Sequence, residues 1–303
     1  MHDHSHHLDV SRKLVIATIA TGLFVVVEAG VGFASNSLAL VGDALHNFTD
    51  ALALVIAFAA VRFERRPATT NKSYGYHRAG VLAAFINAAT LAAVTIYIFF
   101  EAFARLRRPE TLNSTAMLFT AVAALALNAI ITLSLRRHGK QDLNIRGAVL
   151  HMFGDAVSSA GIILAAILIR TTGRVFWDSA VSILIGVGIL WSSWDVLREA
   201  VNLLLEGTPA GIDPDEVTRA IGAIDGIFGV HHLHIWALAP SRPALSCHLM
   251  VGDVPVRHTG TLLEQVNELL AHEFDIAHTT IQFEFANCEA DDPYCVPYSP
   301  GER

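Results

Sequence analysis

The sequence predicts an α-helical membrane protein with six transmembrane helices, followed by a small cytosolic α+β domain. Composition is the first reason: 53% of the 303 residues are hydrophobic and only 16% are charged, whereas soluble proteins carry roughly 25% charged residues. Length is the second, because six apolar segments can each cross roughly 30 Å of hydrocarbon. They cover residues 14–34, 38–61, 79–104, 114–135, 147–170 and 176–204. The third is a change of pattern after Glu206, where long apolar runs give way to short amphipathic ones.

Positive side chains predict the orientation of these spans, since cytoplasmic loops carry an excess of Lys and Arg. With the N-terminus inside, the inner segments hold eleven such residues and the outer loops five. The outer cluster Arg105–Arg108 runs against this trend. The first apolar segment is too long for a signal peptide, and three cysteines without framework spacing fit a reducing compartment. We therefore expect an integral membrane protein whose N- and C-termini are both cytosolic.

The segment after the last span has the pattern of a soluble domain. Asp213-Pro214 opens a helix to about Ala223, with Asp as the cap and Pro at the first helical position. Two alternating strands, an amphipathic helix and a third strand follow, over 228–238, 244–251, about 256–274 and 279–285. The order αββαβ predicts an open-sheet domain. The expected divisions are a His-rich N-terminal tail (1–11), the transmembrane domain (12–206), the cytosolic domain (207–286) and a flexible tail (287–303).

Charge is unevenly distributed along the chain. Residues 1–206 carry 17 basic and 14 acidic side chains, whereas residues 207–303 carry 4 and 14, a formal charge of −10. An acidic surface attracts cations and repels nucleic acid. We therefore expect metal ions and membrane lipid as partners, and no nucleic acid.

Two matched pairs of ionisable residues lie inside apolar segments: His46 with Asp50, and His151 with Asp155. A spacing of four residues stacks both side chains on one helical face. Ionisable residues within a span are costly and mark function by default. Two imidazoles and two carboxylates would form a tetrahedral set suited to Zn²⁺, with Cd²⁺, Co²⁺ or Ni²⁺ as secondary ions. Asp43 lies on nearly the same face and fits an accessory acceptor, an entry guide or a structural role equally well.

The same four side chains predict exchange against protons. Zn²⁺ needs neutral imidazoles and ionised carboxylates, so metal binding displaces protons. Without metal, two buried carboxylates would be costly, and protonation of the two imidazoles restores neutrality. Imidazoles in general titrate near cytoplasmic pH. The stoichiometry stays open, because four neighbouring groups can share protons.

Several stretches occur in a recognisable order: Asn36-Ser37-Leu38-Ala39-Leu40, Asp43-Ala44-Leu45-His46, Tyr74-Gly75-Tyr76-His77-Arg78-Ala79, His151 to Ser159, Glu206-Gly207-Thr208-Pro209 and His231-His232-Leu233-His234-Ile235-Trp236. They resemble the cation diffusion facilitators, specifically the zinc-transporting branch, over essentially residues 8–288. The resemblance implies a homodimeric antiporter of the bacterial inner membrane that exports zinc from the cytoplasm by alternating access, in exchange for protons. It also implies a ferredoxin- or metallochaperone-like cytosolic domain, and a transport site formed by His46, Asp50, His151 and Asp155.

The resemblance further implies a cytosolic metal site at His231, His248 and Glu284, with Gln282 where some members have histidine. His258 lies near another family ligand position, and His77 falls where some relatives have a loop zinc site. From the residues alone, His232 and His234 share one face of a regular strand and His231 takes the other, so these three cannot bind one ion there. The weaker metal candidates are His77, His234, His258, His278, Cys288 and Cys295.

Other roles for metal remain open. The N-terminal histidines His2, His4, His6 and His7 fit a cytosolic metal collector or a simple tail. Zinc shared between two acidic cytosolic domains would offset their like charge and act as a regulatory ion. Two alternatives to transport are a membrane metal sensor and an intramembrane zinc hydrolase. The hydrolase lacks a His-Glu-x-x-His motif, and four protein ligands leave no position for water, so we expect no enzyme.

Overall fold

The structure, a computed structural model, describes residues 3–64, 66, 68–136, 143–240 and 242–285. The chain divides into two compact units, Met1–Phe58 with Ile86–Leu197, and Ala59–Phe85 with Arg198–Arg303. Six long helices precede the C-terminal domain within the described ranges. They are α1 (Asp3–Ser35), α2 (Leu38–Glu64), α3 (Ala79–Arg107), α4 (Ser114–Arg136), α5 (Leu143–Thr172) and α6 (Phe176–Leu204).

These helices have the character of membrane spans. Four stretches have the required length and a mean hydropathy of 1.7 to 2.2: Ala79–Arg107, Ser114–Leu133, His151–Thr172 and Phe176–Leu204. Ile19–Ser35 is a shorter apolar stretch of α1, and α2 completes the six expected helices. Large apolar side chains such as Phe100, Leu184 and Trp191 are exposed on the outside of the first unit. A helix that is apolar on all faces is typical of a membrane span.

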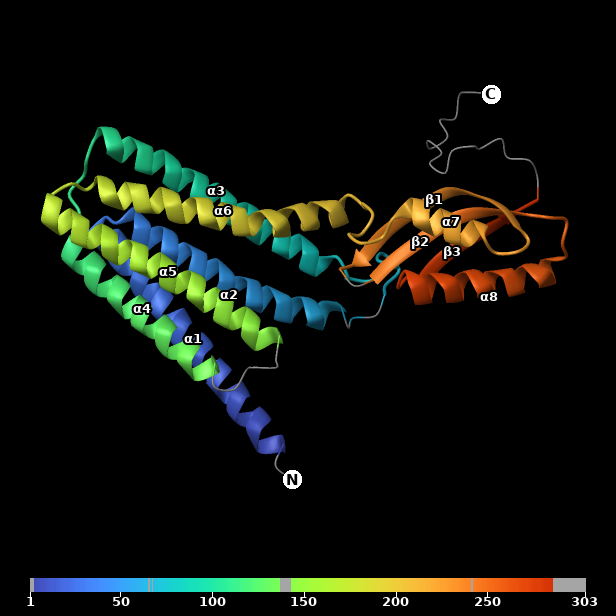
Figure 1. Ribbon diagram of the computed structural model, residues 1–303, viewed down its shortest axis with the longest axis horizontal. Helices are drawn as coiled ribbons and strands as arrows, with labels where there is room; N and C mark the ends of the chain where they lie inside the picture. Colours follow the sequence, from blue (N-terminus) through green and yellow to red (C-terminus); the bar gives the residue numbers. More distant parts are fainter. Residues whose placement is uncertain (1–2, 65, 67, 137–142, 241, 286–303) are drawn as a thin grey trace. The chain divides into compact units, whose positions relative to one another are not determined.

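Small side chains allow close packing between the helices of the first unit. Its buried core includes Ala39 of α2, Ala121 of α4, and Ala165 and Ala166 of α5, together with the larger Met117. Alanine at a helix interface lets two backbones approach closely, which is the usual way that membrane helices associate. Consistent with this, α4 and α5 lie side by side, with α1 alongside α4 (Figure 1).

Arg105, which runs against the charge rule, has a structural role. Its guanidinium donates to the backbone oxygen of Asn36 at 2.7 Å and to the Asn36 side chain at 2.9 Å, and it pairs with Glu101 at 2.9 Å. Asn36 is the first residue of the connection between α1 and α2 and has a φ of +58°, a left-handed conformation that Asn tolerates well. Arg105 therefore fixes this turn, and its charge is locally neutralised.

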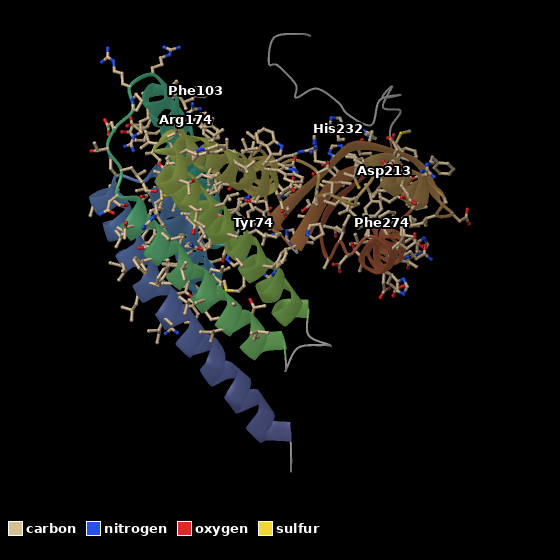
Figure 2. All side chains as sticks on the ribbon, turned by 60° about the vertical axis from the view of Figure 1, so that its left-hand side comes forward. Tyr74, Phe103, Arg174, Asp213, His232 and Phe274 are labelled. Carbon is tan, nitrogen blue, oxygen red and sulfur yellow. The ribbon has the colours of Figure 1, made fainter. Side chains whose placement is uncertain are left out.

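The second unit contains the expected αββαβ order: α7 (Pro214–Gly222), β1 (Ile227–Ala239), β2 (Arg242–Val251), α8 (Val256–Glu273) and β3 (His278–Glu284). The Asp213 side chain accepts a hydrogen bond from the Asp215 amide at 3.0 Å, which caps α7 as the sequence predicts. The strands lie in the order β1-β2-β3, antiparallel and then parallel. Both helices contribute to one core beneath the sheet, including Ile221 of α7 and Leu270 of α8. Figure 2 labels Asp213, which directly precedes α7, and Phe274, which directly follows α8.

Candidate metal centres

The structure brings the four intramembrane His and Asp side chains together, two from α2 and two from α5. Nε2 of His46 lies 3.4 Å from Oδ2 of Asp50 and 3.9 Å from Oδ1 of Asp155. Nε2 of His151 lies 3.4 Å from Oδ2 of Asp50 and 3.7 Å from Oδ2 of Asp155. Each imidazole therefore faces both carboxylates. Because zinc binds such atoms at about 2.0–2.2 Å, donors spaced in this way can share a single ion.

The electrostatics of this group also favour a positive charge. Asp155 is only 3% exposed, while His46 is 21% and Asp50 35% exposed. Oδ2 of Asp50, Oδ2 of Asp155 and Nδ1 of His46 are buried without a hydrogen-bond partner in the part of the chain that the structure describes. Carboxylates in such surroundings are costly unless a cation or protons compensate them. The group can therefore hold either a divalent metal ion or protons.

Asp178 of α6 fixes the start of the helix that carries His46 and Asp50. Its carboxylate accepts hydrogen bonds from the Ser37 hydroxyl at 2.6 Å, the Leu38 amide at 2.9 Å and the Ala39 amide at 3.3 Å. A carboxylate at a helix N-terminus satisfies free amides and interacts favourably with the helix dipole. The cap lies about two turns before His46. Through Asp178, α6 therefore fixes the position of α2, the helix that carries His46 and Asp50. The sequence does not predict this role of Asp178, because its partners are 139 to 141 residues away along the chain.

A second group lies on the sheet and joins the three expected cytosolic residues, one from each strand. Nε2 of His231 lies 3.1 Å from Oε2 of Glu284, and Nδ1 of His248 lies 2.8 Å from Oε1 of Glu284. His231 pairs directly with His248 across β1 and β2. Gln282 does not extend the imidazole cluster, but its amide donates to Glu284 at 2.7 Å and orients that carboxylate.

His232 also joins this group, contrary to the prediction that it faces away from His231. The prediction is wrong because β1 is irregular here: its register shifts between His231 and His234, and His232 has a φ of +51°. Its Nδ1 lies 2.9 Å from Nδ1 of His231, and its ring stacks on His248 with centroids 4.6 Å apart. His231, His232 and His248 each offer a nitrogen within 4.8 Å of the others. Figure 2 shows His232 on β1.

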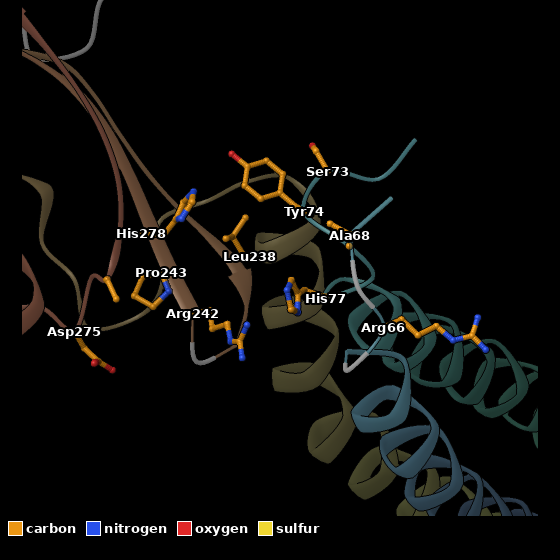
Figure 3. Close-up of a pocket in the computed structure, with 12 residues that line it drawn as sticks. Arg66, Ala68, Ser73, Tyr74, His77, Leu238, Arg242, Pro243, Asp275 and His278 are labelled. Carbon is orange, nitrogen blue, oxygen red and sulfur yellow. The ribbon is translucent and has the colours of Figure 1, made fainter. Parts of the chain in front are cut away.

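The remaining candidates lie apart from these groups. His234 is exposed on β1, and His258 is exposed in the first turn of α8. His77 and His278 line one cavity of about 500 Å³, together with Tyr74 (Figure 3). Among the residues described, His77, His234, His258 and His278 belong to no group of three possible metal ligands. Cys288, Cys295, His2 and the side chains of His4, His6 and His7 lie outside the part that the structure describes.

Comparison with known proteins covers almost the whole chain. Residues 14–205 match the family described as "Cation efflux transmembrane domain", and residues 209–286 match "Cation efflux protein, cytoplasmic domain". The chain is 42% identical over 291 residues to the metal cation efflux system protein CzcD of Cupriavidus metallidurans, covering 96% of this chain and 92% of that protein. It is 40% identical over 300 residues to the zinc transporter ZitB of Shigella flexneri, covering 96% and 95%. It is 37% identical over 285 residues to the cadmium, cobalt and zinc/H(+)-K(+) antiporter of Bacillus subtilis, covering 93% and 91%.

Proposed function

This chain belongs to the cation efflux family, and from that premise we propose that it exports zinc from the cytoplasm across a bacterial plasma membrane in exchange for protons. It is an integral membrane transporter and not an enzyme. The observation that carries the proposal is the convergence of two His/Asp pairs from α2 and α5, with Nε2 of each imidazole within 4.0 Å of both carboxylates. We assign zinc transport to His46, Asp50, His151 and Asp155.

The donor set supports zinc as the main substrate. Imidazole and carboxylate together suit borderline ions, whereas sites built only of oxygen favour Mg²⁺, Ca²⁺ or Mn²⁺ and thiolates favour Cu⁺. The similar proteins named for zinc alone and for cadmium, cobalt and zinc agree with this choice. We therefore infer that Cd²⁺, Co²⁺ and Ni²⁺ are transported as secondary ions.

Charge balance at the site supports antiport. When Zn²⁺ is bound, its two charges offset Asp50 and Asp155. When zinc leaves, protons on His46 and His151 offset the same carboxylates, which lie near both rings. Either state avoids an uncompensated charge inside the helices, so the two cargoes replace one another. The B. subtilis relative is named as an H(+)-K(+) antiporter, which agrees with cation exchange.

The cytosolic group supports an extension of the proposal to regulation. We infer that His231, His232, His248 and Glu284 bind zinc as a regulatory ion, in a domain spanning residues 207–286 of a homodimer. Buried Nε2 of His231 and Nδ1 of His248 lack well-aligned hydrogen bonds within the described residues, although both face Glu284. We also infer that both termini are cytosolic, because the distribution of Lys and Arg between the loops favours that orientation.

Ion flux in proteoliposomes tests the proposed function. Purified wild-type protein should carry Zn²⁺ across the membrane in one direction and protons in the other, so a proton gradient should drive zinc towards the side with the higher proton concentration. Asp50→Asn should lower this flux at least about tenfold, since loss of even an outer partner of a metal ligand costs 10- to 100-fold. Asp195→Asn, the same change at an exposed position of α6, should leave the flux unchanged. Zinc binding without flux would instead indicate a sensor, and zinc-dependent hydrolysis without flux would indicate an enzyme.

A further inference from the structure

A second buried acidic pair lies beside the zinc ligands and has no part in the function proposed so far. Glu28 of α1 is 0% exposed and Asp43 of α2 is 1% exposed. The side chains of Asp43 and Asn47 of α2 are neighbours of the Glu28 carboxyl, but no hydrogen bond joins either of them to it among the residues described. Two helices therefore present carboxyl groups to one another inside the apolar part of the first unit.

The surroundings of this pair supply no fixed positive charge. Neither oxygen of Glu28 has a well-aligned hydrogen-bond donor among the residues described. Asp43 accepts one hydrogen bond, from the Ser158 hydroxyl of α5. The other charged groups that act on the pair are Asp155 and His46 of the zinc site. Two ionised carboxylates that face each other in apolar surroundings repel one another, and each is costly to bury without a partner of opposite charge.

A structural explanation would require donors for these oxygens, as at Asp178, where three donors satisfy one carboxylate. Within the described ranges Glu28 has no such donor, so its two free oxygens need a mobile positive charge. The available oxygens belong to Glu28 and Asp43. Such hard donors accept a proton or an alkali cation, and they are poor ligands for zinc beside a site that also offers imidazole.

We propose that Glu28 and Asp43 form a counter-ion site, distinct from the zinc ligands, that binds one monovalent cation, either a proton or K⁺. The inference rests on the proposed function. A cation between the two carboxyls repels Zn²⁺ from the nearby Asp155 and His46, and its departure restores negative potential there. Counter-ion and zinc therefore exclude each other by charge, which couples their movements.

The first test is counter-ion dependence of zinc flux in proteoliposomes of the full-length protein. One arm applies a proton gradient without K⁺, and the other applies a K⁺ gradient at equal pH. Under the proposed function a proton gradient accelerates the wild type in any case, so the ion at the pair is identified by the arm in which Glu28→Gln loses its acceleration. Glu28→Gln, which keeps the shape but removes the charge, should lose at least about tenfold of this acceleration while binding zinc within about threefold of the wild type.

Matched controls separate the pair from general effects on folding. Thr95→Val removes a different buried polar group, a hydroxyl that donates to the backbone oxygen of Leu91 within its own helix, and it should behave as the wild type. Asp43→Asn is the second variant of the pair and should reproduce the loss seen in Glu28→Gln. If Glu28→Gln or Asp43→Asn folds and its zinc flux still depends on the gradient as in the wild type, the counter-ion site is overturned. Absence of zinc flux in the wild type would instead overturn the proposed function.

A measurement on the unmodified protein covers the case in which both variants fail to fold. Dicyclohexylcarbodiimide reacts with protonated carboxyls in apolar surroundings, and mass spectrometry locates the adduct. Saturating Zn²⁺ should slow the labelling of Glu28 at least about threefold, because zinc at the neighbouring site disfavours a proton on the Glu28/Asp43 pair. Labelling is measured with and without K⁺: slowing by K⁺ as well as by zinc identifies K⁺ as the ion, and slowing by zinc alone identifies the proton. A rate that neither zinc nor K⁺ changes, or no labelling of Glu28 in K⁺-free buffer, would contradict the inference.

Discussion

At the scale of single residues, the backbone of His232 determines the composition of the cytosolic group. Its φ of +51° lies in the left-handed region, which costs roughly 1–2 kcal/mol for residues other than glycine. Such strain persists where the surrounding structure compensates it, and it is concentrated at functional sites. Here the torsion places a third imidazole against His231 and His248. We infer that metal binding by this ring compensates the strain.

Replacement of His232 by Asn tests this inference, because Asn tolerates the left-handed conformation but lacks the imidazole. The test uses a protein that already carries Asp50→Asn, so that zinc binding at the transport site does not obscure the cytosolic group. In this protein His232→Asn should weaken zinc binding to the cytosolic group about tenfold, as measured by calorimetry. The melting temperature should change little, since the backbone is preserved. His234→Asn, at an exposed position two residues away, serves as the control, and equal affinities in the two variants would contradict a role for His232.

The two groups differ in how far their residues could be predicted from the sequence. An α-helix has a fixed periodicity, so His46 and Asp50 could be placed on one face from their spacing alone. A strand alternates only while it stays regular, and the shifted register of β1 after His231 reverses the orientation expected for His232. Glu28 could be recognised as a buried polar residue, but its proximity to Asp43 depends on the packing of α1 against α2.

Cys247 provides a test of pH dependence in the cytosolic domain. Burial raises the pKa of its thiol to about 12 from an ordinary value of 9.0. Between these values the unfolded chain has lost the proton and the folded chain keeps it, so stability is present below pH 9 and falls as pH rises above it, by up to ~1.4 kcal/mol per pH unit.

The stability of the Cys247→Ala variant should therefore decline less steeply between pH 9 and 11 than that of its parent. Urea denaturation followed by circular dichroism measures this slope, with Cys288 and Cys295 replaced by Ser in both proteins. Parallel slopes in the two proteins would mean that the thiol is ionised equally in the folded and unfolded states.

At the scale of whole helices, α3 and α6 approach each other closely at Gly186. A Cβ at this position would overlap the ring of Phe99 and lie 3.1 Å from Cγ2 of Thr95. A side chain here would force the two helices apart or displace the ring. Gly30 of α1 is different, since a Cβ there meets nothing within 4 Å. The sequence does not distinguish these two glycines. It does predict the bounds of α2 to α6 to within four residues, whereas α1 begins at Asp3, eleven residues before the predicted start of the first span.

Alanine substitutions at the two glycines should therefore have opposite effects. Gly186→Ala should destabilise the protein by about 1–3 kcal/mol, the usual cost of overpacking. Gly30→Ala should be neutral or stabilising by up to about 1 kcal/mol, because alanine is the better helix former. Melting of the detergent-solubilised protein, monitored by intrinsic fluorescence, measures both. A lower melting temperature for Gly30→Ala than for Gly186→Ala would contradict the proposed close approach.

At the scale of the whole molecule, charge separates the C-terminal residues from the rest of the chain. Residues 207–303 carry a formal charge of −10, against +3 for residues 1–206. In a homodimer, two such acidic segments repel each other through solvent over about one Debye length, roughly 8–10 Å at physiological salt. Under the proposed regulation, zinc bound to each cytosolic group would lower this repulsion. Cytosolic zinc would then favour association of the domains and bias the membrane helices towards transport.

Small-angle scattering of the 207–303 fragment tests this electrostatic mechanism. Added Zn²⁺ should raise the fraction of dimer or reduce the radius of gyration of the dimer, and the effect should shrink at 1 M salt, where the Debye length is roughly 3 Å. The double variant His248→Ala, Glu284→Gln removes two of the expected ligands and should not respond. An identical response of this variant would mean that zinc acts at other surface groups, and no response of the parent fragment would eliminate a regulatory role of zinc through this domain. A response of the parent that persists undiminished at 1 M salt would show that zinc bridges the subunits by direct coordination, since screening cannot remove a metal–ligand bond.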